Sequence, residues 1–279
     1  MSEDKSGEDE PREDETRTTE RRRPRLDKAS RHERILAEMM ATPTLRVGDL
    51  AADLEVSTET IRRDLFELQE RGLINRTYGG AVRPFAAEPA VTERHAMMVA
   101  EREAIAALAV KFIKPKEVIA IGAGATTTHV ARRMAAECRD LTVITHSFSV
   151  ATVVAANPTI DVIMCPGRYN AREGMMVGVE TVEFLQNYNV NRAILGISGI
   201  TTDGLADAEA PAASVYKAMM NRSAETLVVS DHKKFDVQAL AIWARIPDIQ
   251  RLVVDRSPGG AVARALARAG VEISVATRR

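Results

Sequence analysis

The stretch STETIRRDLFELQERGLINRTYGGA, residues 57–81, predicts a helix followed by a hairpin. Apolar side chains recur at Ile61, Leu65 and Leu68, which is the spacing of one buried helix face. Ser57 stands just before this stripe, and serine is a preferred N-cap because its hydroxyl accepts a hydrogen bond from a free backbone amide. The helix is therefore expected to begin directly after Ser57.

The end of this stretch predicts a tight turn between two short strands. Gly72 is expected to cap the helix, because glycine enters the left-handed conformation that ends many helices. Leu73 and Ile74, followed by the turn at Gly79 and Gly80, are typical of a small β-hairpin.

Two further helices are predicted upstream of this stretch. Their apolar faces are Ile35, Leu36, Met39 and Met40 in the first, and Val47, Leu50, Ala51 and Leu54 in the second. Three short helices and a hairpin define a winged helix-turn-helix, which we place at residues 30–83.

The third helix has the chemistry of a DNA-recognition helix. When its apolar stripe faces the core, hydroxyl and guanidinium side chains face outward, where they suit phosphates and guanine edges. Residues of the hairpin are expected to meet the DNA backbone or the minor groove. The predicted DNA-binding residues are Ser57, Thr58, Thr60, Arg62, Arg63, Arg76, Thr77, Gly79 and Gly80.

Charge leaves a second interpretation open. The chain holds 38 Lys and Arg against 39 Asp and Glu, so no overall field attracts nucleic acid. Residues 31–83 are no more basic than acidic. Periodicity alone therefore allows either a DNA-binding or a protein-binding module.

The motifs of this region favour DNA binding. The string from Ser57 to Ala81 resembles the signature of the DeoR family of bacterial transcriptional regulators, and RHERILAEM, residues 31–39, is similar to that family's first helix. The resemblance implies a repressor, less often an activator, of sugar or nucleoside catabolic genes.

Two segments flank the predicted DNA-binding domain. Residues 1–29 are too poor in apolar side chains to form a core, so we expect a disordered tail, acidic over residues 1–15. A cluster of basic residues follows, which suggests either a solvated tail or a basic arm that lies along the phosphates of DNA. The cluster comprises Arg21, Arg22, Arg23, Arg25, Lys28 and Arg31. Residues 84–100 contain two prolines and no clean period, and are expected to form a linker.

Residues 101–279 predict a Rossmann-like α/β domain for effector binding and oligomerisation. Short apolar runs alternate with helical stretches, which is typical of a mostly parallel sheet covered on both faces. The predicted strands are 118–121, 141–145, 160–165, 193–197, 226–230, 252–255 and 271–275. The predicted helices are 101–113, 126–138, 147–156, 178–187, 210–222 and 259–269.

Three loops follow predicted strands and are candidates for anion binding. They are GAGATTT at 122–128, THS at 145–147 and SDHKKF at 230–235. Ligands of an open parallel sheet bind beyond the carboxyl ends of its strands, where all three loops are expected. Each loop also has a purely structural interpretation: a tight turn, a hydrogen-bonded histidine and a solvated charge cluster.

The resemblance to the DeoR family extends to these loops. It implies a C-terminal domain similar to sugar-phosphate isomerases that binds phosphorylated sugars. Matching positions are Gly124, Thr126, Thr127, Thr145, Ser147, Gly167, Asp231, Lys234 and Phe235, whereas Gly122, Ala125, His146 and Pro166 depart from the family pattern. The predicted effector-binding residues are Gly122, Gly124, Ala125, Thr126, Thr127, His146, Ser147, Gly167, Arg168, Asp231 and Lys234.

These patterns predict a homo-oligomeric regulator, a dimer or tetramer, that binds an operator in double-stranded DNA and a small, phosphorylated sugar-like effector. The alternative is a sugar-phosphate isomerase-like enzyme with a DNA-binding head. Its acid–base candidates would be Asp203, Asp207, Glu209 and Lys234. The acidic stretch is otherwise a polar surface loop, and we predict no catalytic residue.

Other classes find little support in the sequence. The five His residues show no paired metal-ligand spacing, and the two Cys residues form no CxxC motif, so neither a metal nor a cofactor is expected. No apolar run approaches 18 residues, so we expect no membrane association and a cytoplasmic location.

Overall fold

The computed structural model of the chain describes residues 26–41, 44–71, 73–77, 79–82 and 88–277, with only the backbone at residues 40, 41, 44, 75–77 and 82. The chain divides into two compact units between residues 83 and 84. The predicted tail up to residue 25 and the predicted helix cap at Gly72 lie outside the described residues.

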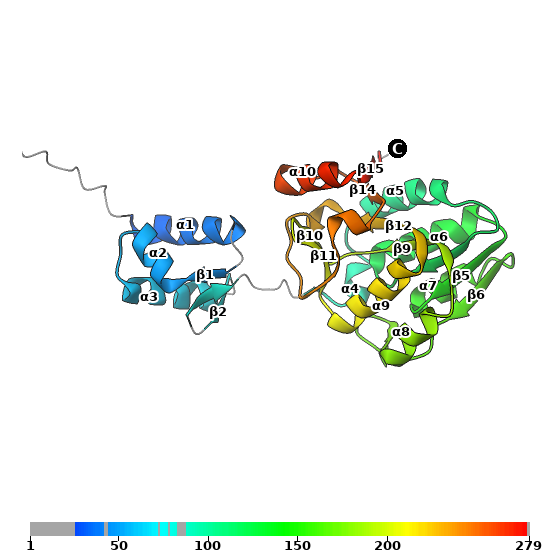
Figure 1. The fold of residues 1–279 in the computed structure, drawn as a ribbon, viewed down its shortest axis with the longest axis horizontal. Helices are drawn as coiled ribbons and strands as arrows, with labels where there is room; N and C mark the ends of the chain where they lie inside the picture. The colour runs from blue at the N-terminus through cyan, green and yellow to red at the C-terminus, as the bar shows by residue number, and fades with distance from the viewer. Residues whose placement is uncertain (1–25, 42–43, 72, 78, 83–87, 278–279) are drawn as a thin grey trace, which may run out of the picture. The chain divides into compact units, whose positions relative to one another are not determined.

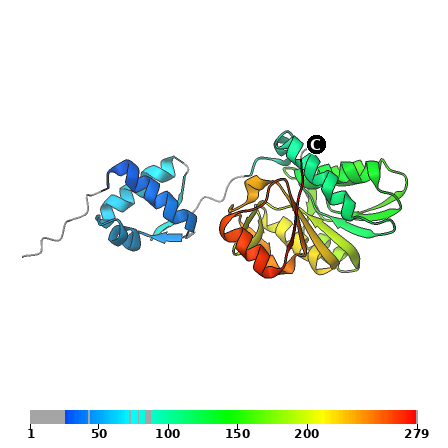
Figure 2. The same cartoon turned by 90° about the horizontal axis from the view of Figure 1, so that it is seen from above.

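The first unit confirms the winged helix-turn-helix. Three helices cross one another (Figure 2) and are joined by a small antiparallel sheet. The helices are α1 (Lys28–Ala41), α2 (Val47–Asp53) and α3 (Thr58–Glu70), and the strands, in sheet order, are β1 (Thr44–Arg46), β3 (Gly80–Val82) and β2 (Asn75–Thr77). The predicted stripes supply its core, since Ile35, Leu50 and Ile61 are all essentially inaccessible to solvent.

Strand β1 was not predicted. Its pairing with β3 buries Leu45 against the helices, and three residues are too few to show a period. The same pairing explains Gly80, because a Cβ there would lie 1.8 Å from the carbonyl oxygen of Leu45. Gly80 is therefore required by backbone packing.

Two residues of the predicted basic arm are ion-paired within the first unit. The guanidinium of Arg31 lies against the buried carboxylate of Asp64, and Lys28 contacts Glu67 at 2.6 Å. Both partners belong to α3, so these two cations fasten α1 to α3 and are not available as parts of a mobile arm.

The second unit confirms the predicted parallel α/β domain. Its large sheet has seven strands, and every neighbouring pair is parallel. In sheet order the strands are β15 (Glu272–Val275), β14 (Arg251–Val254), β12 (Ser223–Ser230), β9 (Val190–Leu195), β4 (Val118–Ile121), β5 (Leu141–Thr145) and β6 (Ile160–Met164). These strands are the seven that the apolar runs predicted.

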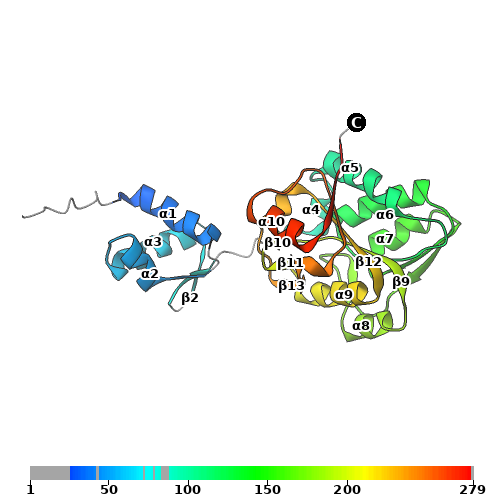
Figure 3. The ribbon, with the colours of Figure 1, turned by 45° about the horizontal axis from the view of Figure 1, so that its top comes forward.

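Helices cover both faces of this sheet (Figures 1 and 3). One face packs against α5 (Val99–Ala109), α6 (Ala125–Glu137) and α7 (Phe148–Val154), and the other against α8 (Val179–Leu185), α9 (Ala210–Asn221) and α10 (Gly260–Ala269). Each face of the sheet has its own hydrophobic core, and successive residues of a strand point to opposite faces. In β4, Ile119 and Ile121 pack into the core beneath α5 and α6, and Ala120 packs into the core on the other face. None of the described helices is both long and apolar enough to span a bilayer.

Short strands add a second layer that the sequence did not predict. An antiparallel sheet comprises β10 (Gly199–Thr201), β11 (Gly204–Asp207) and β13 (Ala241–Ala244), and a hairpin comprises β7 (Arg168–Asn170) and β8 (Met175–Val177). Short 3-10 helices complete the chain at Val110–Phe112, His232–Lys234 and Ile246–Asp248.

The stretch 84–100, expected to be a linker, contributes structure to the second unit from residue 88 onward. It includes α4 (Val91–Arg94) and the start of α5. The side chains of Glu88 and Arg94 are only about 10% exposed, because each pairs with charged residues of the sheet domain. Those partners lie far along the chain and could not be recognised by local periodicity.

Candidate functional site

The outer face of α3 presents the predicted DNA-binding side chains. Thr58, Arg62 and Arg63 are exposed. The hydroxyl of Ser57 accepts a hydrogen bond from the Thr60 amide at 3.1 Å, which confirms the predicted N-cap. Glu59 lies 3.8 Å from Arg62 and 3.5 Å from Arg63, and these exposed pairs are weak enough for phosphates to replace.

The hairpin places the remaining predicted DNA-binding positions directly after α3. Strand β2 holds Arg76 and Thr77, whose side chains lie outside the description, and Gly79 is exposed at the turn. Gly80 is buried, and its contact with β1 gives it a structural role.

A cavity of about 250 Å³ opens at the carboxyl ends of β4, β9 and β12 in the second unit. Its walls include the N-terminal turn of α6, formed by Gly124, Ala125, Thr126 and Thr127, together with Lys234. These five residues were predicted to bind the effector, and the fold brings them together around one cavity. The first amides of a helix have no acceptor within the helix, so the α6 terminus suits an anion.

Gly122 lies behind the cavity wall. A Cβ at this position would be 2.9 Å from Cε1 of Tyr216, so the tyrosine ring occupies the space that a side chain would need. The Tyr216 hydroxyl donates to the carbonyl of Ala123 at 2.9 Å, and both Tyr216 and Ala123 line the cavity. The cavity floor is therefore aromatic beside Gly122.

His146 supports the loop and does not line the cavity. It is fully buried, its Nε2 accepts from the Ala123 amide at 3.1 Å, and its Nδ1 donates to the Met176 carbonyl at 2.8 Å. Burial lowers the pKa of His146 to about 4, so the ring is neutral at pH 7. A neutral ring between one donor and one acceptor holds the turn after β4.

The other predicted effector residues also lie outside the cavity lining. Ser147 caps α7 through the Val150 amide, and Arg168 is exposed on β7. Gly167 packs closely on Thr181 and Val177, and a Cβ there would lie 2.2 Å from the Thr181 hydroxyl. Asp231 is buried and accepts a hydrogen bond from Arg102, which does line the cavity, at 3.1 Å.

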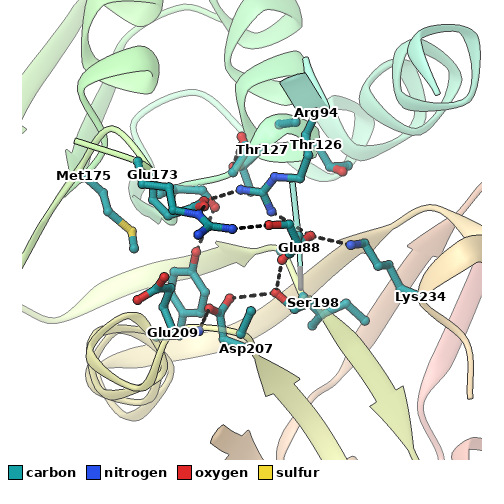
Figure 4. Close-up of a pocket in the computed structure, with 18 of the residues that line it drawn as sticks. Glu88, Arg94, Thr126, Thr127, Glu173, Met175, Ser198, Asp207, Glu209 and Lys234 are labelled. Carbon is teal, nitrogen blue, oxygen red and sulfur yellow. Dashed lines mark hydrogen bonds and ion pairs between the residues drawn. The ribbon is translucent and has the colours of Figure 1, made fainter. Parts of the chain in front are cut away.

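The centre of the cavity holds a carboxylate that the sequence did not single out. Figure 4 shows Glu88 between Arg94 and Lys234, with Ser198 below it. Glu88 bonds to Lys234 and Ser198, and to Arg94 at 2.6 Å. Burial raises the pKa of Glu88, but the charges of Lys234 and Arg94 outweigh it and hold the pKa below its ordinary value.

Three further carboxylates line the cavity. Burial raises the pKa of Glu173 to about 7, in spite of the neighbouring Arg94, and raises the pKa of Asp207 to about 6. Asp207 accepts from the Glu209 amide at 2.8 Å. Asp203, an acid–base candidate from the sequence, lies outside this lining. The cavity thus combines a cationic wall with oxygen acceptors suited to hydroxyl groups.

Sequence inspection missed Glu88, Arg94, Arg102, Glu173 and Ser198, all of which line the cavity. Glu88 and Arg94 stood in a proline-containing stretch, and none of the five lies in a motif that marks a ligand site. Among the residues with described positions, no cluster of His, Cys, Asp and Glu is arranged to hold a metal ion.

Comparison with known proteins shows the family to which the chain belongs. Residues 31–85 match the DeoR-like helix-turn-helix domain, and residues 97–256 match the DeoR C-terminal sensor domain. The chain belongs to the DeoR family, and it is a DNA-binding transcriptional regulator of that family. This membership argues against the isomerase alternative, because the matching relatives are named as transcriptional repressors.

Relatives match over most of their length. The HTH-type transcriptional repressor CsqR of Escherichia coli is 29% identical, covering 87% of this chain and 94% of the relative. The glycerol-3-phosphate regulon repressor of Haemophilus influenzae is 31% identical, and the match covers 85% of this chain and 93% of the relative. A solved D-ribose-5-phosphate isomerase, in complex with phospho-erythronic acid, aligns with a TM-score of 0.36 and 18% identity, over 48% of this chain and 52% of the isomerase. That structural likeness is too low to support an argument.

Proposed function

We propose that this regulator represses carbohydrate catabolic genes and responds to a phosphorylated sugar-like effector bound in the cavity. The cytoplasm is the compartment in which such a regulator would meet its operator. Relatives named as repressors, one of them of a glycerol-3-phosphate regulon, support the class of genes.

One observation carries the effector assignment: the α6 N-terminus and Lys234 line the same cavity. A phosphoryl group there would accept hydrogen bonds from the first amides of α6 and an ion pair from Lys234. Glu173, Asp207 and Glu209 would accept hydrogen bonds from sugar hydroxyls. One cavity can therefore bind both parts of a sugar phosphate.

DNA binding is proposed to use the exposed face of α3 and the wing. Thr58 and the α3 amides suit phosphates, and Arg62 and Arg63 suit guanine edges in the major groove. A homo-oligomer would present two such helices to a repeated operator.

A thermal-shift screen of the full chain tests the effector class, because a ligand of the native state raises the melting temperature. We expect stabilisation by sugar phosphates and by inorganic phosphate, and a smaller effect or none from free sugars. Stabilisation by free sugars, with no response to any phosphate, would contradict the proposed effector.

A further inference from the structure

We infer that the Glu88 carboxylate is an internal ligand of the cavity's anion subsite, and that an effector binds there only by displacing it. This inference rests on the proposed function, since it assumes an anionic effector. The inference goes beyond the proposed function by assigning to Glu88 the selection of effectors according to their charge.

Glu88 makes the contacts that a bound oxyanion would make. Oε1 faces the Lys234 ammonium and, at 2.6 Å, the Arg94 guanidinium, and Oε2 accepts from the Ser198 hydroxyl. An ammonium, a guanidinium and a hydroxyl are the donors that proteins use for phosphate. The subsite is therefore filled by the protein's own carboxylate (Figure 4).

The donors do not depend on Glu88 for their position in the fold. Lys234 belongs to the 3-10 helix after β12, Ser198 follows β9, and Arg94 belongs to α4. Glu88 itself lies in no helix or strand, and its backbone carbonyl accepts a hydrogen bond from Arg172 at 2.5 Å. Glu88 can leave the subsite without any change in the pairing of the sheet.

Exchange of Glu88 for a ligand favours a doubly charged group. A monoanion would replace one carboxylate with another and gain little electrostatic energy. A phosphoryl group carries close to two negative charges at neutral pH, so it interacts more strongly with Lys234, Arg94 and the α6 terminus. Glu88 therefore acts as a specificity-determining residue for strongly charged oxyanions.

Displacement also affects the start of the second unit. Glu88 lies six positions after Val82, which ends β3 in the first unit. Release of the Glu88 carboxylate removes the ion pair with Lys234 and leaves Arg94 of α4 paired with Glu173.

Calorimetry on the full chain with inorganic phosphate tests the inference. Glu88→Gln removes the competing charge, and Glu93→Gln, an exposed position on α4, removes the same charge away from the subsite. If Glu88 vacates the subsite in a tenth of molecules, Glu88→Gln should bind phosphate about tenfold more tightly, because apparent affinity scales with the competent fraction. Glu93→Gln should bind like the wild type, and acetate should bind measurably only to Glu88→Gln.

The outcomes separate this inference from the proposed function. Phosphate binding by the wild type, with unchanged or weaker binding by Glu88→Gln, would overturn the internal-ligand role and leave the effector site in place. No binding of phosphate or sugar phosphates to either protein would overturn both.

Hydrogen exchange on the wild-type chain gives a second measurement that needs no variant. Saturating phosphate should slow exchange of the amides at 125–128 and accelerate exchange at Val91, which lies three positions after Glu88. The Val91 amide donates to the Arg172 carbonyl at 3.3 Å. Slower exchange in both segments would show that Glu88 stays in place, and would overturn the inference.

Discussion

Arg31 on α1 and Asp64 on α3 form a two-point ion pair, with Nε to Oδ2 at 2.5 Å and Nη2 to Oδ1 at 2.9 Å. His32 lies 3.2 Å from the same carboxylate. Asp64 is 2% exposed although it belongs to the helix that we expect to contact DNA. The carboxylate therefore sets the position of α3 against α1.

Asp64→Asn should destabilise the first unit by about 2 kcal/mol, because it leaves a shielded guanidinium without its charged acceptor. Urea unfolding of the full chain, followed by circular dichroism, measures this loss. Glu59→Gln, an exposed change on the same helix, should alter stability by less than about 0.5 kcal/mol. Equal effects of the two changes would show that the buried pair contributes nothing.

Arg62→Ala and Arg63→Ala should each weaken operator binding by about 1–3 kcal/mol, because each removes a candidate contact to a base edge or a phosphate. Fluorescence anisotropy with DNA sequences selected from a random pool measures the affinity, and light scattering checks that the oligomeric state is the same as that of the wild type. Arg71→Ala, at the exposed C-terminal end of α3, is the matched control. Undiminished binding by both variants would reject α3 as the recognition helix.

Lys234→Ala should abolish the response to a phosphorylated effector and spare DNA binding without ligand, because it removes a cation that lines the cavity of the proposed effector site. We expect at least about a tenfold loss of phosphate affinity. Lys233→Ala removes an adjacent, exposed cation and should have little effect. A response that survives in Lys234→Ala would place the anion elsewhere.

Gly122→Ala should destabilise the second unit by about 1–3 kcal/mol, because its Cβ would press on the Tyr216 ring. Gly48→Ala provides the opposite control: a Cβ at this position on α2 meets nothing within 4 Å, and alanine favours a helix by up to about 1 kcal/mol. Thermal unfolding of the two variants should therefore shift in opposite directions. A neutral Gly122→Ala would mean that Tyr216 moves aside freely.

The raised pKa of Glu173 predicts a dependence of stability on pH. Between its ordinary value of 4.5 and the folded value of about 7, unfolding releases a proton that the folded state keeps. The contribution of Glu173 to the free energy of unfolding therefore falls as pH rises through this window and is constant on either side. Melting temperatures of the wild type should decline more steeply across the window than those of Glu173→Gln, and parallel curves would contradict the assignment.

Much of the fold could be predicted from the sequence, because local patterns encode it. The Ile61, Leu65 and Leu68 stripe and the Ser57 cap define α3, and the apolar runs define all seven strands of the large sheet. The three-residue strands β1 and β10 were not predicted, because three residues are too few to show an apolar period.

The candidate effector site was only half predictable. The α6 turn and Lys234 follow strands whose carboxyl ends lie at one edge of a parallel sheet. Ligands of such sheets bind at this edge, so the order of the strands in the sequence was enough to predict that these residues lie there. Gly122 and His146 also lie at that edge, but their orientation behind the wall depends on packing against Tyr216 and Met176.

The sequence by itself determined a winged helix-turn-helix joined to a parallel α/β sensor domain, because periodicity, capping and turn residues act over a few neighbouring positions. Only the tertiary structure decided which charges meet in the cavity. Glu88 and Lys234 are 146 positions apart, and the residues between them must fold before the carboxylate and the ammonium come into contact. No local pattern records such a contact, since its energy arises from burial and charge in the assembled domain.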